Sequence, residues 1–102
     1  MLNQIVLVGR LTENPTIKEL ENDRKVTTIT LAVQRSYKNT DGVYETDFIP
    51  CILWNGIATN TTEYCKKGDV VGVKGRLQVR EDKIEIVAEK VTFLSSKPKE
   101  SE

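Results

Sequence analysis

The sequence of 102 residues contains no histidine and only two cysteines, so it lacks the side chains that most metal sites and many catalytic sites require. Histidine is the commonest general base and the commonest metal ligand. The two cysteines, Cys51 and Cys65, have no CxxC spacing and fall in different predicted elements. Neither a metal site nor a disulfide framework is therefore expected. Both cysteines are predicted to be small buried apolar side chains in a reducing compartment.

The chain also lacks an excess of charge of either sign and any long apolar run. Its 15 lysines and arginines balance 15 aspartates and glutamates, so the net charge indicates no particular partner. A local basic stripe is still compatible with this balance. The first segment, MLNQIVLVGRL, has too short an apolar run for a signal peptide or a membrane span. We therefore expect a cytoplasmic protein, and its length suits a single domain with one core.

Most of the sequence alternates between apolar and polar residues, which indicates β-strands that are buried on one side. We predict long strands and one short edge segment over residues 2–11, 16–20, 25–35, 44–54, 69–80 and 83–94. Gly9 within the first strand predicts a bend. A shift of the apolar phase in the last strand predicts a bulge near Glu89 and Lys90. The last two strands are joined by a tight turn at Glu81 and Asp82.

One segment, after the third long strand, has the spacing of a helix. Its candidate buried residues recur at helical intervals and are Ile57, Thr61, Tyr64 and Cys65. We expect Tyr64 to pack in the core and Asn55 to cap the start of the helix. Three strands, one helix and two strands is the order of an OB-fold. The predicted fold class is therefore mainly all-β, a five-stranded OB-fold barrel with one helix between the third and fourth strands.

The third long strand contains the stretch DFIPCILW, in which both faces carry apolar or aromatic side chains. Ile49, Cys51 and Leu53 share one face and are predicted to fill the core. Phe48 and Trp54 share the other face, roughly 20 Å apart at the rise of a strand. These two aromatic residues fit a core or a subunit interface, because aromatic side chains bury well. They also fit a surface on which nucleic-acid bases stack.

Several segments, taken in order, resemble the bacterial single-stranded DNA-binding protein family over residues 1–94. The opening MLNQIVLVGRLTENP resembles the start of that family, and TLAVQRSY resembles its second strand, which ends in an aromatic residue. Asp47 and Phe48, followed by an apolar run to Trp54, resemble its third strand. The segment TEYCKKGDVVGVKGRLQVR resembles its helix end and fourth strand. We assign residues 1–94 to one binding domain and expect residues 95–102 to form a polar, disordered tail.

The resemblance implies a protein that binds single-stranded DNA without sequence preference, usually as a homotetramer, with no cofactor and no catalysis. It implies a role in DNA replication, recombination and repair in the bacterial cytoplasm, whether a cell, a phage or a plasmid encodes the chain. The family's base-stacking residues fall on Tyr37, Phe48 and Trp54. Its phosphate-contacting residues fall on Arg10, Arg35, Lys67, Arg76 and Arg80. Lys74 extends these contacts as part of a basic row on the predicted fourth strand, although a charged face can also be merely solvated.

The sequence departs from the family pattern in three places. The turn at Glu81 and Asp82 carries no stacking aromatic residue, so we expect weaker engagement of DNA there. Pro50 and Gly56 stand where a basic residue is often found. The last residues do not form the acidic tail with a hydrophobic tip that commonly recruits replication and repair proteins. Partners of that kind would therefore meet this chain without their usual binding motif.

Two other functions compete with the coating of single-stranded DNA. The short last hairpin and the missing tail also fit a dimeric, primosome-type OB-fold adaptor that mainly bridges replication proteins. A nuclease would need paired carboxylates. Glu45 and Asp47 share a strand face, but no histidine or second acidic cluster accompanies them, and this function is the least favoured. For the assembly, we expect a homotetramer in which the edge of the first strand, LNQIVLVG, pairs between subunits.

Overall fold

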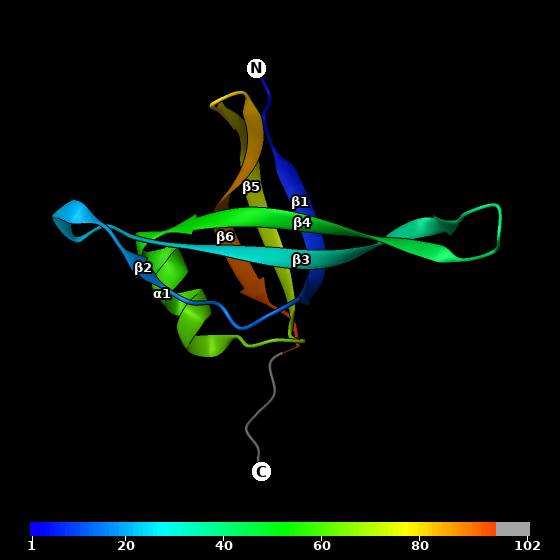
Figure 1. Cartoon of the computed structure of the whole chain (residues 1–102), viewed down its shortest axis with the longest axis horizontal. Coiled ribbons are helices and arrows are strands. Elements are labelled where there is room, and N and C mark those ends of the chain that lie inside the picture. Colours follow the sequence, from blue (N-terminus) through cyan, green and yellow to red (C-terminus); the bar gives the residue numbers. More distant parts are fainter. Residues whose placement is uncertain (96–102) are drawn as a thin grey trace, which may run out of the picture.

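The computed structural model describes residues 1–95 and consists of β-strands with one α-helix and one short 3-10 helix (Figure 1). The elements, in chain order, are β1 (Ile5–Leu11), β2 (Lys18–Glu19), η1 (Glu21–Asp23), β3 (Lys25–Lys38), β4 (Tyr44–Trp54), α1 (Asn55–Tyr64), β5 (Val70–Arg80) and β6 (Lys83–Phe93). All the predicted strands are present, and β4 has the predicted bounds. The expected disordered tail lies, apart from residue 95, outside the described residues.

The five long strands close into a barrel, which confirms the predicted fold class. Their order is β1-β5-β6-β4-β3, and the short β2 pairs with β3. The barrel closes where β1 meets β3, at Arg10 and Leu11. β4 and β6 run parallel to each other, and the other paired strands are antiparallel. The helix α1 packs against β3, β4 and β6 below the long β3–β4 ribbon in Figure 1.

Two glycines allow neighbouring strands to approach closely in the barrel. A Cβ atom on Gly9 would lie 2.7 Å from the carbonyl oxygen of Ala32, so the contact between β1 and β3 needs a residue without a side chain. A Cβ atom on Gly75 would overlap the carbonyl oxygen of Val87. The register of β5 and β6 shifts beside Gly75, and Glu89 is the extra residue of β6. The predicted bulge is therefore confirmed.

Alternate residues of the long strands fill the core. The strand residues with no exposed surface are Leu31, Leu53, Val71 and Val73. Cys51 and Cys65 are buried, as the sequence predicts. Burial raises the pKa of both thiols to about 11, because a thiolate loses its hydration in an apolar environment. Both cysteines are therefore protonated at neutral pH and serve as packing residues.

The start of α1 differs from the prediction. Its N-cap residue is Trp54, and Asn55 is the first helical residue, with a φ of 53°. The Asn55 side chain accepts a hydrogen bond from the backbone N–H of Lys25 at 3.1 Å, and no side chain caps the helix. The prediction that Asn55 caps α1 is therefore wrong, because this amide ties the helix start to β3.

The C-terminal end of α1 also differs from the prediction. The buried residues of the helix are Ala58 and Thr61, whereas Tyr64 is 64% exposed. Tyr64 is therefore not a core residue, and its ring lies 6.0 Å from the ring of Phe93 at the barrel surface. The helical spacing was correct, but the buried side of so short a helix is set by the barrel that it covers. No helix within residues 1–95 is long and apolar enough to cross a membrane.

Two hairpins extend beyond the barrel, one formed by β3 and β4 and one by β5 and β6 (Figure 1). We call residues 35–47, the distal part of the first hairpin, the arm. Its loop is held by Asn39, whose Oδ1 atom accepts hydrogen bonds from two backbone N–H groups of the loop at 2.9 and 3.0 Å. The second hairpin turns at Glu81 and Asp82, which both have positive φ angles, so the predicted tight turn is confirmed.

Candidate nucleic-acid interface

The residues of β4 that point away from the core form a continuous surface, which we call the outer face. The register irregularity of the β3–β4 ladder lies in β3, so the side chains of β4 alternate regularly. The outer face consists of Tyr44, Thr46, Phe48, Pro50, Ile52 and Trp54. Its cross-strand neighbours on β3 include Val26, Thr28, Thr30, Ala32 and Gln34. None of these side chains carries a charge, so a polyanion would meet no repulsion from them.

The two sides of β4 have different environments, as the sequence predicts. Cys51 and Leu53 are buried and Ile49 packs against them, whereas Phe48 is 65% exposed and Trp54 is half-buried. The core is complete without Phe48. An aromatic ring that is left in water does not add to the stability of the fold in proportion to its size, and such rings are typical of binding surfaces.

The aromatic residues at the two ends of the outer face each lie close to a cation. The guanidinium carbon of Arg24 is 5.5 Å from the centroid of the Trp54 ring. The Nζ atom of Lys38 is 5.7 Å from the centroid of the Tyr44 ring. Both distances are within the range of cation–π interactions, about 6 Å. The sequence does not indicate Arg24, Lys38 or Tyr44 as binding residues, because only the strand register shows that Lys38 is opposite Tyr44 and only the fold places Arg24 beside Trp54.

Tyr37, a predicted stacking residue, lies on the arm but not on the outer face. Lys38 is paired with Tyr44 and shares its side of the hairpin. The preceding side chain, that of Tyr37, therefore points to the opposite side. Tyr37 is 65% exposed there. The structure thus brings Phe48 and Trp54 together on one face and places Tyr37 on the other face of the arm.

Arg35, a predicted phosphate contact, is held by two carboxylates at the base of the arm. Its Nε and Nη2 atoms donate hydrogen bonds to Asp47 at 3.1 and 3.0 Å, and its Nη1 atom is 2.8 Å from Glu45. The hydrogen bond from Arg35 lowers the pKa of Asp47, and the same bond raises the pKa of Arg35. Glu45 and Asp47 therefore bind an arginine. Within residues 1–95, no group of acidic residues and cysteines is arranged so that it could hold a metal ion.

The predicted basic row lies on the outward side of β5, and β6 separates it from β4. Two of its arginines are paired with acids of β6, Arg76 with Glu89 at 3.2 Å and Arg80 with Glu85 at 2.7 Å. The hydrogen bond from Arg80 lowers the pKa of Glu85, and the pKa of Arg80 is raised by the same contact. Among residues 1–95, Lys74 has no carboxylate within the 4.0 Å of an ion pair.

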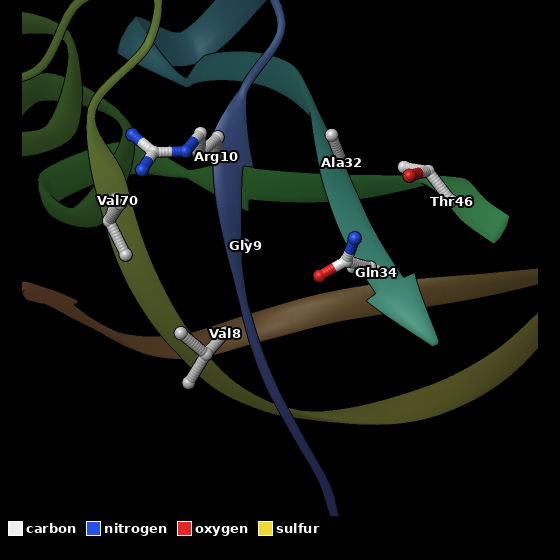
Figure 2. A pocket seen from close by; sticks show the side chains of 7 residues that line it. All are labelled: Val8, Gly9, Arg10, Ala32, Gln34, Thr46 and Val70. Carbon is white, nitrogen blue, oxygen red and sulfur yellow. The ribbon is translucent and has the colours of Figure 1, made fainter. Parts of the chain in front are cut away.

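Arg10 and Lys67, the other two predicted phosphate contacts, meet at one turn, because Lys67 lies in the turn and Arg10 of β1 contacts it. The Nη1 atom of Arg10 donates to the carbonyl oxygen of Gly68 at 3.0 Å, and the backbone N–H of Lys67 donates to Asn14 at 2.7 Å. Arg10 also lines a shallow cavity of about 430 Å³ between β1 and β3, into which the Gln34 amide points (Figure 2). The six predicted phosphate contacts therefore form three groups on different elements.

Comparisons with known proteins find similar sequences and a similar fold. The model of the single-strand binding protein family matches residues 2–94. Single-stranded DNA-binding protein B of Bacillus subtilis is 43% identical, over 98% of this chain and 96% of that protein. Single-stranded DNA-binding protein 1 of Clostridium acetobutylicum is 44% identical, over 94% of this chain and 96% of that protein. Single-stranded DNA-binding protein A of Bacillus subtilis is 43% identical, but the chain spans only 62% of its length.

A solved structure shows the same fold. It is that of a deletion mutant of the single-stranded DNA binding protein from Thermus aquaticus, with a TM-score of 0.74 and 23% sequence identity. The match covers 91% of this chain and 50% of that chain. The similarity supports the arrangement of the barrel.

Proposed function

The chain belongs to the single-strand binding protein family, and on this basis we propose that it binds single-stranded DNA without sequence preference and protects it during replication, recombination and repair. The observation that carries this proposal is the uncharged outer face of β4, on which Phe48 is exposed and Trp54 is half-buried although the core is complete without them. Every base has a π face, so stacking on such rings, worth about 1–3 kcal/mol per base, does not depend on sequence. We infer a binding role without catalysis in the bacterial cytoplasm, and residues 1–94 as the binding domain.

The proposed stacking residues differ in how a DNA strand reaches them. Phe48 and Trp54 lie on one line along β4, so one strand can stack on both. Tyr37 is on the opposite face of the arm, so its stacking requires the strand to pass around the arm. These placements make Phe48 and Trp54 the principal stacking residues and Tyr37 an additional one.

The proposed phosphate contacts differ in whether a carboxylate is already bound to the cation. Arg35, Arg76 and Arg80 must exchange a carboxylate for a phosphate, because each is already in an ion pair. A phosphate that binds there releases fewer counterions than one at an unpaired cation. We therefore expect a larger share of the salt dependence from Lys74, and also from Arg10 and Lys67.

Titration with oligo-dT tests the proposed function directly. Trp54 is the only tryptophan of the chain, so its fluorescence reports on one place on the outer face. A stacked base should quench it, and the affinity should fall as salt is raised. The absence of both quenching and binding at low salt would contradict the proposal. Labelled DNA that is cleaved in the presence of a divalent metal would contradict the absence of catalysis.

We also propose that the chain forms a homotetramer through β1. This strand pairs with β5 along its length, but its other edge pairs with β3 only at Arg10 and Leu11. Within residues 1–95 the backbone groups of Ile5–Gly9 on that edge are therefore open to another strand, and Val6 and Val8 beside them are exposed. Such an edge is suited to pairing between subunits. Light scattering should give four times the mass of the chain, and a monomer mass would contradict the assembly.

A dimeric adaptor that bridges replication proteins is the second candidate function. The turn at Glu81 and Asp82 carries no aromatic residue, and the hairpin beside it exposes Val79 and Ile84 on the side away from the basic row. Exposed apolar residues of this kind fit a protein partner better than DNA. A dimer mass together with weak oligo-dT binding, and capture of a helicase or another primosome component, would favour this function over the coating of DNA.

A further inference from the structure

The outer face of β4 carries a third aromatic ring that the proposed function does not use. Tyr44 lies at its arm end and is 44% exposed. We propose that Tyr44 is a further base-stacking residue, and that Lys38 and Arg24 contact phosphates at the two ends of the outer face. This inference rests on the proposed binding of single-stranded DNA and extends the binding surface from the barrel onto the arm.

The geometry places the three rings on one line. Tyr44, Phe48 and Trp54 all point to the outer side of the same regular strand. At about 3.3 Å per residue, Phe48 is roughly 13 Å from Tyr44 and roughly 20 Å from Trp54. The side chains between them are small, apolar or uncharged, so a single strand of DNA can lie along all three rings without a turn.

The charges favour the same path. The acids of this strand, Glu45 and Asp47, point to the opposite side and are bound by Arg35. The outer face itself is uncharged, and cations stand at its two ends, Lys38 at one and Arg24 at the other. A polyanion along β4 would therefore be attracted at both ends and repelled by no side chain of the face between them.

Each cation is placed so that it can move from the ring to a phosphate. A base that stacks on Tyr44 displaces the ammonium group of Lys38 from the face of the ring. Because the stem of Lys38 is flexible, the ammonium group can then reach the phosphate of the bound nucleotide. Arg24 and Trp54 form the same arrangement at the other end. The exchange costs little, because a cation–π contact at an exposed site is weak. Asn39 keeps the arm end in shape by hydrogen bonds to its own loop and to Glu45 at 3.1 Å.

The test measures the affinity of variants for oligo-dT of increasing length by fluorescence anisotropy. Tyr44→Ala should raise the Kd for long oligo-dT by about 5- to 150-fold, and Tyr44→Trp should restore the affinity. The shortest oligo-dT, which spans only Phe48 and Trp54, should bind this variant normally. Tyr64→Ala is the matched control, because Tyr64 is also an exposed tyrosine but lies on α1.

The cations are tested through the salt dependence of the same binding. Lys38→Ala and Arg24→Ala should each reduce the slope of log K against log salt by about 0.7, the value for one phosphate contact on a single strand. Lys18→Ala, which removes an exposed cation of β2, should leave the slope unchanged. An equal reduction in all three variants would show a general charge effect and would overturn the proposed contacts.

The outcomes separate this inference from the function on which it rests. If Phe48→Ala weakens binding and Tyr44→Ala has no effect at any length of oligo-dT, the inference is wrong and the proposed function stands. If neither substitution has an effect, the proposed binding surface itself is wrong. The circular dichroism of each variant should match that of the parent chain, since the substituted residues are exposed.

Discussion

Phe48 and Leu53 lie on opposite sides of β4, and replacing each with alanine should separate binding from stability. Leu53 has no exposed surface, and a Leu→Ala change in a core costs about 2–5 kcal/mol of unfolding free energy. In a domain of this size, the melting temperature should then fall by at least about 8 °C. Phe48 is 65% exposed, so Phe48→Ala should change the melting temperature much less. The loss of one stacked base should instead raise the Kd for oligo-dT by about 5- to 150-fold.

The assay combines thermal unfolding, followed by circular dichroism, with quenching of Trp54 by oligo-dT. Both variants keep Trp54, so the same probe reports on both. Binding is measured at a temperature at which each variant is fully folded, where Leu53→Ala should bind as the parent chain does. If Phe48→Ala lost as much stability as Leu53→Ala and bound DNA normally, Phe48 would be a packing residue and not a stacking residue.

Three further predictions concern the fold and its charges. In chemical denaturation, Gly9→Ala should destabilise the fold by about 1–3 kcal/mol, because the added Cβ would press on a carbonyl oxygen of β3. By contrast, Gly56→Ala should stabilise the fold by up to about 1 kcal/mol, because Gly56 lies on α1 with open space around it. The pKa values of the Cys51 and Cys65 thiols are raised from 9.0 to about 11, so both thiols should react slowly with a thiol reagent at pH 8. The contribution of the two protonated thiols to the stability of the fold should be complete below pH 9.0 and be lost as pH rises through about 11. The pKa of Asp47 is lowered by Arg35, so the stability from this pair should be complete above the ordinary carboxyl pKa of 3.8 and be lost as pH falls through the lowered value; an Asp47 titration by NMR at or above the ordinary value would contradict the pair.

Much of the fold could be predicted because the sequence signals of strands and turns lie in residues that are close together in the chain. The alternation of β4, the tight turn at Glu81 and Asp82 and the bulge at Glu89 all follow from neighbouring residues. The errors occurred where a contact with a distant strand decides the outcome. Asn55 bonds the backbone of Lys25 and does not cap its own helix, and Tyr64 stays exposed because the barrel buries a different side of α1.

The candidate site could be predicted only in part, for the same physical reason. The alternation within β4 was sufficient to place Phe48 and Trp54 on one face. It was not sufficient to show that Lys38 pairs with Tyr44, because β3 has two extra residues before this pair. The acid partners of the basic row were also hidden, because the ion pair of Arg76 with Glu89 depends on the pairing of two strands.

Residue-resolved NMR during titration with oligo-dT can show directly whether the outer face of β4 binds single-stranded DNA. The single indole N–H signal of Trp54 and the amide signals along Tyr44–Trp54 should shift together and saturate at the same DNA concentration. The amide signals of the exposed turns of α1 should remain in place. Shifts confined to α1 or to β1, with an unchanged indole signal, would contradict the account.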